Sequence, residues 1–341
     1  MEGGNYTSSV TIIIPCRNEK NYILKSIEGA FNLDYPRDKL EILVVDGMSD
    51  DGTRELISEL NYPNVKVLDN INKTTPYAFN IGIKNSSSEY VMILGARSFI
   101  SSNYISEAIT IMEANPQIYA VGNGRTEYIY ATEIGKAIAT ATNSKMAIGP
   151  NNIRNIDKSG YVQDVENPLF RKTIFDVIGY FDEELTRNQD DDFTFRIKKA
   201  GLKVYASDKI SCRYQGRETY SNLFKQYFQY GYFKVYVNKK HKTVTTFRQL
   251  VPPIFVLFVL LGFPFFYFIG VVSLFWSILF IYVFLAFSES IRLSGSLKEF
   301  FQIQYAFYNF HFGYGFGYLR GIFHFLILNR KPSLKFQILT R

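Results

Sequence analysis

The chain has 341 residues, of which 47% are hydrophobic and 20% are charged, and this composition excludes a disordered or collagen-like protein. Its length allows about two folding units. Residues 249–288 contain no Asp, Glu, Lys or Arg. An ordinary soluble domain rarely carries such a run, so a purely cytosolic globular protein is disfavoured.

The formal net charge is +7, and the excess positive charge lies on either side of the apolar block. Residues 232–249 hold five Lys or Arg and no acid, and residues 320–341 do the same. This placement favours anionic lipid headgroups as partners and a cytoplasmic orientation. No basic and aromatic recognition motif is present, so we expect no nucleic-acid partner. The polar segment 1–9 lacks a signal-peptide pattern, and we expect the first domain to stay in the cytoplasm.

The first part of the chain alternates apolar strands with helical patterns. We predict strands at 10–14, 41–45, 65–68 and 90–94 and helices at 20–32, 52–60, 75–85 and 103–114. Continuous apolar strands that alternate with helices are typical of a parallel sheet covered on both faces. Such sheets bind ligands at the carboxyl ends of their strands, where this chain is polar.

The pattern becomes less regular from about residue 123 to residue 232. There we expect helices and short strands at the following positions: helices at 172–179, 193–200 and 219–238, and strands at 203–206 and 210–214. The last of these helices is rich in aromatic residues and leads into the first basic segment.

The charge-free block predicts two membrane spans. As a helix it is about 60 Å long, twice the thickness of a hydrocarbon core of roughly 30 Å. We expect spans at about 251–269 and 271–288 with the turn at Gly270; Gly262 and Pro264 mark the rival turn position. A third apolar segment at 300–319 carries polar residues and can span or lie in the interface, so two and three spans both stay open. The positive-inside rule favours two, because a third would place the last basic cluster outside.

Two motifs stand where the first two strands end. Residues 14–19 read Ile-Pro-Cys-Arg-Asn-Glu, and residues 45–53 read Val-Asp-Gly-Met-Ser-Asp-Asp-Gly-Thr. Neither is the GxGxxG fingerprint of dinucleotide-binding folds or the GxxxxGK[ST] of P-loop proteins. A dinucleotide-dependent dehydrogenase and a P-loop NTPase are therefore disfavoured. Further along, residues 187–196 read Arg-Asn-Gln-Asp-Asp-Asp-Phe-Thr-Phe-Arg, after the lead-in Gly-Tyr-Phe-Asp-Glu at 179–183.

Together these motifs resemble family-2 glycosyltransferases of the GT-A fold over roughly residues 9–235. The likeness is greatest to the membrane-attached, succinoglycan-type branch that builds exopolysaccharides and lipid-linked glycans. The resemblance implies an α/β protein, in which a GT-A catalytic domain (Rossmann-like, with a mostly parallel sheet) is followed by C-terminal transmembrane helices.

The resemblance also assigns residues to the nucleotide-sugar donor. It implies that Pro15, Arg17 and Glu19 line the pocket for the base and ribose, with Arg17 where a Tyr is common. Asp46 matches the acid that reads the uracil. Lys73 lies in a segment similar to one that approaches the donor diphosphate. Without the resemblance, the second motif is read as a cap of the helix that follows it and Lys73 as a surface lysine.

The chain departs from the family after the strand at 90–94. There the family has Asp-x-Asp, which holds a divalent metal, whereas this chain reads Gly95-Ala96-Arg97. Sites for Mg²⁺ or Mn²⁺ need oxygen ligands, so we expect no metal-binding residues here, although the family implies such a cofactor. Three interpretations stay open. Arg97 itself binds the diphosphate through paired hydrogen bonds, donor binding is lost, or Arg97 is a solvated loop residue.

The acidic motif supplies the catalytic candidates. The resemblance makes Asp190 the general base, and Asp191 stands beside it. Inverting transfer requires one carboxylate to take the proton of the acceptor hydroxyl. Adjacent acids raise one another's proton affinity, whereas the N-terminus of the following helix favours the charged form. The alternative interpretation is that the three acids at 190–192 cap this helix.

Three further residues are candidates for contact with sugars. Asp164 stands where the family has an acidic segment near the donor sugar. Gln226 and Tyr230 belong to a Gln-x-x-x-Tyr-Gly helix, which takes the place of Gln-x-x-Arg-Trp in processive synthases, so a polymerising synthase is disfavoured. Aromatic residues of this helix can stack on sugars or pack at the membrane surface.

The sequence therefore predicts an inverting glycosyltransferase that moves a hexose from a nucleotide sugar, with UDP favoured, to a lipid-linked acceptor. A polyprenyl-phosphate monosaccharide synthase and an inactive membrane scaffold are the alternatives. The expected layout is a cytoplasmic catalytic domain at 1–232, a basic juxtamembrane linker at 233–249, a membrane region at 250–328 and a basic tail at 329–341. We expect a multi-pass protein of the cell membrane that contacts membrane lipids.

Overall fold

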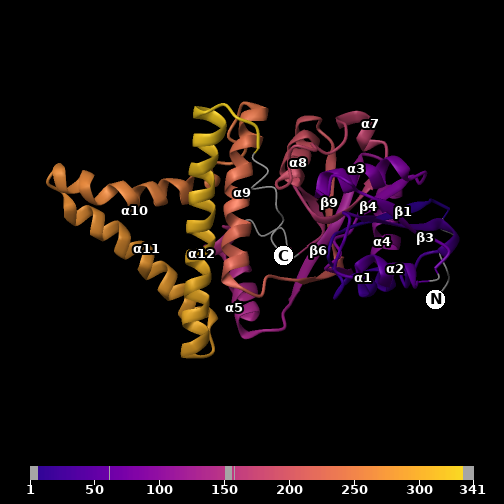
Figure 1. The fold of residues 1–341 in the computed structure, drawn as a ribbon, viewed down its shortest axis with the longest axis horizontal. Helices are drawn as coiled ribbons and strands as arrows, with labels where there is room; N and C mark the ends of the chain where they lie inside the picture. The colour runs from indigo at the N-terminus through magenta and orange to yellow at the C-terminus, as the bar shows by residue number, and fades with distance from the viewer. Residues whose placement is uncertain (1–6, 61, 150–155, 157, 333–341) are drawn as a thin grey trace. The chain divides into compact units, whose positions relative to one another are not determined.

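A computed structural model describes residues 7–60, 62–149, 156 and 158–332, so that most of the basic tail lies outside the described residues. The chain forms two compact units (Figure 1). The first, here called the sheet unit, comprises Met1–Tyr128 and Ile153–Gln215, and the second, the helical unit, comprises Ile129–Asn152 and Gly216–Arg341. The two units therefore interleave along the chain, which differs from the linear layout expected from the sequence.

The sheet unit is built on one mixed sheet with the strand order β3-β2-β1-β4-β8-β6-β9-β5, to which β7 adds by pairing with β9. The strands are β1 (Val10–Cys16), β2 (Leu40–Asp46), β3 (Val65–Asp69), β4 (Tyr90–Ile93), β5 (Ser98–Ile100), β6 (Ile118–Ile129), β7 (Gly160–Val162), β8 (Glu166–Arg171) and β9 (Lys203–Gln215). Strands β3, β2, β1 and β4 run parallel, and β8 runs antiparallel to β4. The predicted parallel strands are thus confirmed, and antiparallel strands extend the sheet.

Helices cover both faces of this sheet. They are α1 (Ile23–Phe31), α2 (Thr53–Ser58), α3 (Thr75–Asn85), α4 (Tyr104–Ala114), α7 (Ile174–Ile178) and α8 (Gln189–Lys199). Figure 1 shows α3, α7 and α8 on one side and α1, α2 and α4 on the other. In β1, Ile12 and Ile14 belong to the core under α1 and α4, whereas Ile13 belongs to the core under α3 and α8. Burial on both faces explains why this strand is a continuous apolar run.

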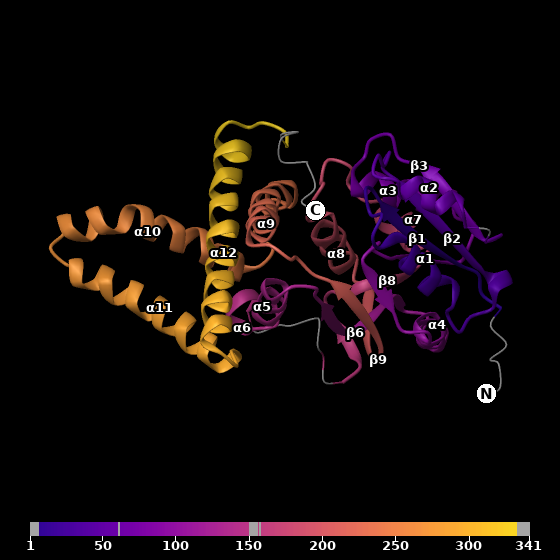
Figure 2. The ribbon, with the colours of Figure 1, turned by 60° about the horizontal axis from the view of Figure 1, so that its bottom comes forward.

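The helical unit contains α5 (Glu133–Thr142), α6 (Lys145–Ile148), α9 (Tyr220–His241), α10 (Val251–Phe268), α11 (Val272–Leu293) and α12 (Leu297–Gly321). Helices α9 and α12 lie side by side (Figures 1 and 2). A Cβ added at Gly317 would lie 1.9 Å from the carbonyl oxygen of Phe228, and one at Gly231 would lie 2.1 Å from that of Tyr314. The two helix backbones touch, so these positions require glycine.

Helices α10 and α11 form a hairpin that meets α12 at its open end (Figure 2). The chain turns at Gly270, whose φ is +77°, whereas Gly262 and Pro264 lie inside α10. Among the described residues, Phe247–Phe268 and Val272–Leu293 are the two helical segments long and apolar enough to cross a membrane, and only 17% of the apolar 18-residue window in each is buried. Core helices of soluble proteins are mostly buried, so these exposed apolar faces favour membrane association.

Candidate active site

The strand register brings the candidate residues of the sheet unit to one edge of the sheet. Strands β1, β2 and β4 are parallel, so the loops after Cys16, Asp46 and Ile93 leave the same edge. Strand β8 is antiparallel to β4, so the segment that enters β8, which contains Asp164, also lies at that edge. The topology therefore places the nucleotide motifs and an acidic residue together, as α/β ligand sites require.

Hydrogen bonds tie the first two loops of this edge to one another. Asn18 and Asp50 bind reciprocally, since the Asn18 amide donates to the Asp50 carboxylate at 2.8 Å and the Asp50 backbone N–H donates back at 3.0 Å. The backbone N–H of Glu19 donates to Thr53 Oγ1 at 2.9 Å. Helix α2 begins after Gly52 without a side-chain cap. Asp50 therefore connects two loops and does not cap α2, in contrast to the capping interpretation.

Asp46 is fully buried at the end of β2. Its Oδ2 accepts hydrogen bonds from the backbone N–H of Ser49 and from Arg54, both at 3.0 Å, and its Oδ1 accepts one from the Ser49 hydroxyl. Arg54 also pairs with Asp69 at 2.7 Å. In this arrangement Asp46 orders the loop after β2, and its contact with a uracil base stays a prediction.

The two arginines of the nucleotide motifs lie in different surroundings. The Nε of Arg17 is buried without a hydrogen-bond partner among the described residues, and its side chain packs against Gly47, where a Cβ would come within 3.1 Å. Arg97 forms an ion pair with Glu19, with 2.8 Å between Nε and Oε2, and lies over the ring of Tyr22. The Arg97 side chain is 19% exposed, so it is not a solvated loop residue.

Pro15 and Lys73 complete the predicted donor residues. Pro15 lies in β1 opposite Val45 of β2 and is partly exposed. Lys73 is exposed after β3, has a φ of +62°, and its backbone N–H donates to Asn70. The structure thus leaves the Lys73 ammonium at the surface, and its contact with a diphosphate stays a prediction.

Three carboxylates gather where β8 begins and α8 starts. Asp164 accepts hydrogen bonds from the backbone N–H of Val165 at 2.9 Å and from Thr194 Oγ1 at 3.0 Å. Burial and the neighbouring charges of Asp190 and Asp191 raise the pKa of Asp164 to about 7. Asp190 is exposed, and Asp191 is partly buried. The site therefore combines a carboxyl group of raised pKa with an accessible one, the pairing that acid–base chemistry uses.

Asp192 has a different position from its two neighbours. It is fully buried and forms an ion pair with Arg196 at 2.9 Å. Arg196 also donates to the carbonyl oxygens of Ile178 and Tyr180. Asp192 therefore fixes α8 to the loop after α7, and Asp190 and Asp191 are the members of the motif that face the site.

Sequence reasoning did not single out several residues that hold the site together. Arg54 neutralises Asp46, and Thr194, one turn after Asp190, binds Asp164. Asn80 is buried and its amide bridges to the Phe181 backbone and to Glu183. The partners of Thr194 and Asn80 are distant in the chain, so spacing carries little signal for these contacts, whereas Arg54 directly follows the motif of its partner Asp46. Asn80 connects α3 to the lead-in of α8.

The residues after β4 do not fit a divalent cation. Gly95 and Ala96 carry no ligand atom in their side chains, and Arg97 is itself a cation. A Cβ at Gly95 would lie 3.2 Å from Ser98 Oγ, in a tight turn. Within the described ranges, no group of three or more His, Cys, Asp or Glu side chains is arranged to hold a metal ion. The donor set at this position therefore lacks the hard oxygen ligands that Mg²⁺ and Mn²⁺ require.

Gln226 and Tyr230 lie on α9 of the helical unit. The Gln226 amide donates to the Tyr230 hydroxyl at 2.8 Å, and Arg217 donates to Gln226 at 3.1 Å. This chain of hydrogen bonds fixes the side chains along one face of the helix. Their role towards a sugar stays a prediction.

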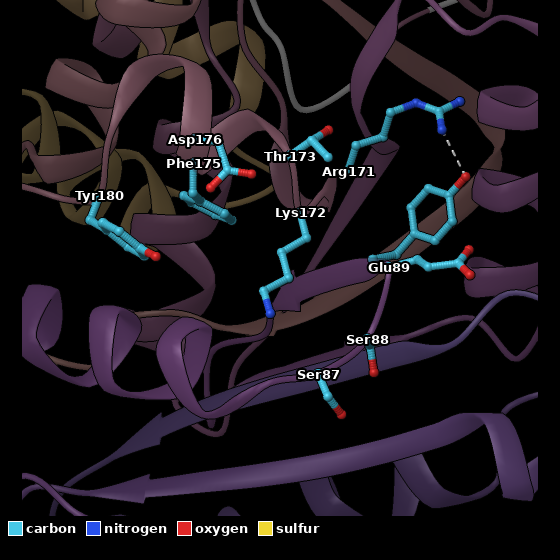
Figure 3. A pocket seen from close by; sticks show the side chains of 10 residues that line it. Ser87, Ser88, Glu89, Arg171, Lys172, Thr173, Phe175, Asp176 and Tyr180 are labelled. Carbon is cyan, nitrogen blue, oxygen red and sulfur yellow. Dashed lines mark hydrogen bonds between the residues drawn. The ribbon is translucent and has the colours of Figure 1, made fainter.

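A cavity of about 590 Å³ lies at the opposite edge of the sheet, beside the start of β4 and the end of β8 (Figure 3). Its two cations are engaged in structural contacts. Arg171 donates to Tyr90 and to the carbonyl oxygens of Met112 and Ile118, and Lys172 donates to the carbonyl oxygen of Ser86. This cavity contains none of the predicted site residues and is not the candidate active site.

Comparison with known proteins gives the family. The sequence profile "Glycosyl transferase family 2" matches residues 11–179. A Methanococcus voltae enzyme, dolichyl N-acetyl-alpha-D-glucosaminyl phosphate 3-beta-D-2,3-diacetamido-2,3-dideoxy-beta-D-glucuronosyltransferase, is 30% identical over 233 residues, which cover 65% of this chain and 71% of the relative. The succinoglycan biosynthesis protein ExoA of Rhizobium meliloti is 28% identical over 256 residues, covering 72% of this chain and 75% of the relative.

Solved structures give the same fold. A mannosyltransferase of Pyrobaculum calidifontis, solved with GDP-Man and Mn²⁺, has a TM-score of 0.50 and 16% identity, covering 97% of this chain and 78% of that chain. GalNAc-T7, solved with UDP, GalNAc and Mn²⁺, has a TM-score of 0.50 and 14% identity, covering 62% of this chain and 44% of that chain. The GT-A fold and the family expected from the motifs are confirmed, and the chain belongs to glycosyltransferase family 2 as a glycosyltransferase.

Proposed function

We propose that this glycosyltransferase moves a hexose from a nucleotide sugar to a lipid-linked acceptor and inverts the anomeric configuration. The observation that carries the proposal is the grouping of Asp164, Asp190 and Asp191 at the sheet edge that also carries the nucleotide motifs. An exposed carboxylate close to the bound donor is what an inverting transfer needs.

The relatives support the class of acceptor. The Methanococcus voltae enzyme is named for its action on a dolichyl-linked aminosugar phosphate, and ExoA is named for succinoglycan biosynthesis. By analogy, the acceptor of this chain is a saccharide carried on a polyprenyl-type lipid, and the pathway is that of an exopolysaccharide or a lipid-linked glycan. UDP is the proposed nucleotide, because Asp46 stands where the family reads uracil.

The proposed chemistry uses Asp190 as the general base. The acceptor hydroxyl gives its proton to the Asp190 carboxylate while its oxygen attacks the anomeric carbon of the donor. The bond between that carbon and the diphosphate oxygen breaks, and the nucleoside diphosphate leaves from the opposite face.

The hairpin of α10 and α11 supplies the proposed link to the membrane. Both helices are long and apolar enough to cross a bilayer, and the preceding segment 232–249 holds five Lys or Arg. Positive flanking segments stay on the cytoplasmic side. We therefore place both ends of the hairpin, and with them the sheet unit, on the cytoplasmic side of a multi-pass membrane protein.

The test is incubation of the detergent-purified chain with radiolabelled nucleotide sugars and a membrane lipid extract, followed by extraction into organic solvent. We expect one nucleotide sugar to label a lipid-linked saccharide. Label on a bare polyprenyl phosphate would instead identify a polyprenyl-phosphate monosaccharide synthase. If no nucleotide sugar labels any lipid fraction, the proposed transfer to a lipid-linked acceptor is wrong.

A further inference from the structure

Two arginines at the nucleotide edge stand where the family has other residues. Arg17 follows β1 at a position where a Tyr is common, and Arg97 follows β4 where the family has its metal-binding acids. The first change adds a positive charge, and the second replaces carboxylates with a positive charge. Both changes shift this edge of the sheet toward binding an anion without a metal ion.

The backbone around Arg97 holds its side chain in a fixed place. The backbone N–H of Ser98 closes a turn on the carbonyl of Gly95 at 2.9 Å, and the backbone N–H of Gln215 donates to the carbonyl of Arg97 at 3.0 Å. The Arg97 guanidinium lies 4.9 Å from the ring centre of Tyr22, and its Nε binds Glu19. That bond uses one of five N–H donors, so the two terminal nitrogens can still face a phosphate.

Arg17 lies on the loop that follows β1, at the same edge of the sheet as Arg97. Its Nε is buried and has no hydrogen-bond partner among the described residues. A buried donor without a partner is costly in a folded protein and calls for an explanation. Arg17 and Glu19 lie on the same loop, and Glu19 holds Arg97. Arg97 is therefore held beside the loop that carries Arg17.

We infer that Arg17 and Arg97 together bind the diphosphate of the nucleotide-sugar donor, so that nucleotide binding does not require a divalent cation. Guanidinium groups bind phosphate oxygens through paired, charge-assisted hydrogen bonds. They can neutralise the leaving diphosphate where Gly95 and Ala96 leave no carboxylate for a metal. This inference rests on the proposed function, since it assumes a nucleoside diphosphate donor.

The experiment is isothermal titration of UDP, GDP and dTDP into the detergent-purified full-length chain, once with EDTA and once with Mn²⁺. We expect a nucleoside diphosphate to bind with dissociation constants that agree within about twofold between the two buffers, a difference well under 1 kcal/mol. Stronger binding in Mn²⁺ by tenfold or more would overturn the inference and leave the glycosyltransferase function standing. Failure of all three nucleotides to bind in both buffers would contradict the proposed function itself.

Variants identify the residues in the same titration. Arg97→Ala and Arg17→Ala should each weaken binding in EDTA by about tenfold to a hundredfold, the effect of losing a charged hydrogen bond. The matched control is Arg37→Ala, because Arg37 is exposed, lies over Phe31 and precedes β2 at the opposite edge. It should bind as the unaltered chain does.

Folding of each variant is checked by its thermal unfolding, and Arg97→Lys serves where Arg97→Ala unfolds. Lysine keeps the charge but not the planar fork, so its binding should fall between those of the unaltered chain and the alanine variant. Unchanged binding in both Arg97 variants would remove Arg97 from the diphosphate site. Equal losses in Arg97→Ala and in the control Arg37→Ala would also contradict the inference, because a general effect of lost positive charge would then explain both.

Discussion

Neighbouring acids of one motif have different tasks in this glycosyltransferase. Asp190 is exposed at the site, whereas Asp192, two residues on, is buried against Arg196. The helical repeat explains this difference, because residues two apart point to different sides of α8. A sequence motif of three acids therefore combines a chemical group with a structural ion pair.

Replacement of Asp192 should affect stability before chemistry. In Asp192→Ala the guanidinium of Arg196 loses its buried partner, and breaking such a pair costs about 3 kcal/mol. We expect the free energy of unfolding of the sheet unit to fall by this amount, so that the urea midpoint moves to a lower concentration. Asp190→Asn is the control and should leave the unfolding midpoint nearly unchanged, because Asp190 is exposed. Equal shifts in both variants would contradict these assignments.

Asp164 makes the stability of the sheet unit depend on pH. Its pKa is 3.8 in an unperturbed chain and about 7 in the folded unit. Between these values the folded state binds a proton that the unfolded state has lost, so the free energy of unfolding falls as pH rises from about 4 to about 7. Asp164→Asn should remove this part of the fall, as measured by calorimetric melting temperatures at pH 5 and pH 8. This assignment is wrong if the melting temperature changes by the same amount between pH 5 and pH 8 in Asp164→Asn and in the unaltered chain.

Individual motifs in the sequence predicted which loops carry the site but not how their side chains pair. The sequence pattern singled out Asp46 and Asp50, but only the structure shows that Asp46 pairs with Arg54 and Asp50 with Asn18. The contact of Asp164 with α8 joins segments that are far apart in the chain. Such contacts are set by strand register, which composition and spacing do not contain.

At the scale of elements, strands with a continuous apolar pattern were predictable and strands with mixed patterns were not. Strands β1 to β4 match their predicted ranges closely, and in β1, β2 and β4 burial on both faces leaves a clear signal. Strand β3 lies at the sheet's margin and is mostly exposed. Strands β6 and β8 lie in a region that the sequence left irregular. Strand β9 is one strand where two were expected, since the polar residues Ser207 and Asp208 bind Glu107 and Ser159 at its middle.

The pairing of α9 with α12 depends on glycines that have no room for a side chain. A Cβ at Gly317 would clash with the Phe228 carbonyl at 1.9 Å. Gly317→Ala should therefore force the helices apart and cost about 1–3 kcal/mol, the range for overpacked sites. Gly295→Ala is the control, because its Cβ would meet only Glu299 at 3.5 Å. The midpoint temperature of thermal unfolding in detergent should drop for Gly317→Ala alone. A similar drop in both variants would refute close packing at Gly317.

At the scale of the whole molecule, a soluble-type sheet unit and an apolar hairpin occur in one chain. Mean composition hides this division, since the charged fraction of 20% averages over both parts. The charge-free block revealed the hairpin from sequence because its signal is local and long. The assignment of residues 129–152 to the helical unit could not be read from the sequence, because it depends on packing against helices more than 60 residues away.

Arginine on the hairpin should prevent stable membrane insertion. Leu260 and Ile281 lie near the middle of α10 and α11 and are more than half exposed. An arginine at the centre of a span costs roughly 2.5–3.5 kcal/mol, so Leu260→Arg with Ile281→Arg should release the chain from membranes in alkaline carbonate. Val244→Arg, outside the hairpin, should stay in the membrane pellet as the unaltered chain does. Retention of the double variant would mean that these helices do not span the bilayer.

The central claim is that carboxylates at the nucleotide edge of the sheet transfer a sugar onto a lipid carrier. The most direct measurement compares lipid-extractable label from a radioactive nucleotide sugar in Asp190→Asn and in Asp176→Asn, whose exposed carboxylate lies at the cavity on the opposite edge. Loss of a general base lowers the rate by about 10²–10⁴-fold. We predict this loss in Asp190→Asn alone, and full transfer by that variant, or an equal loss in both, would contradict the claim.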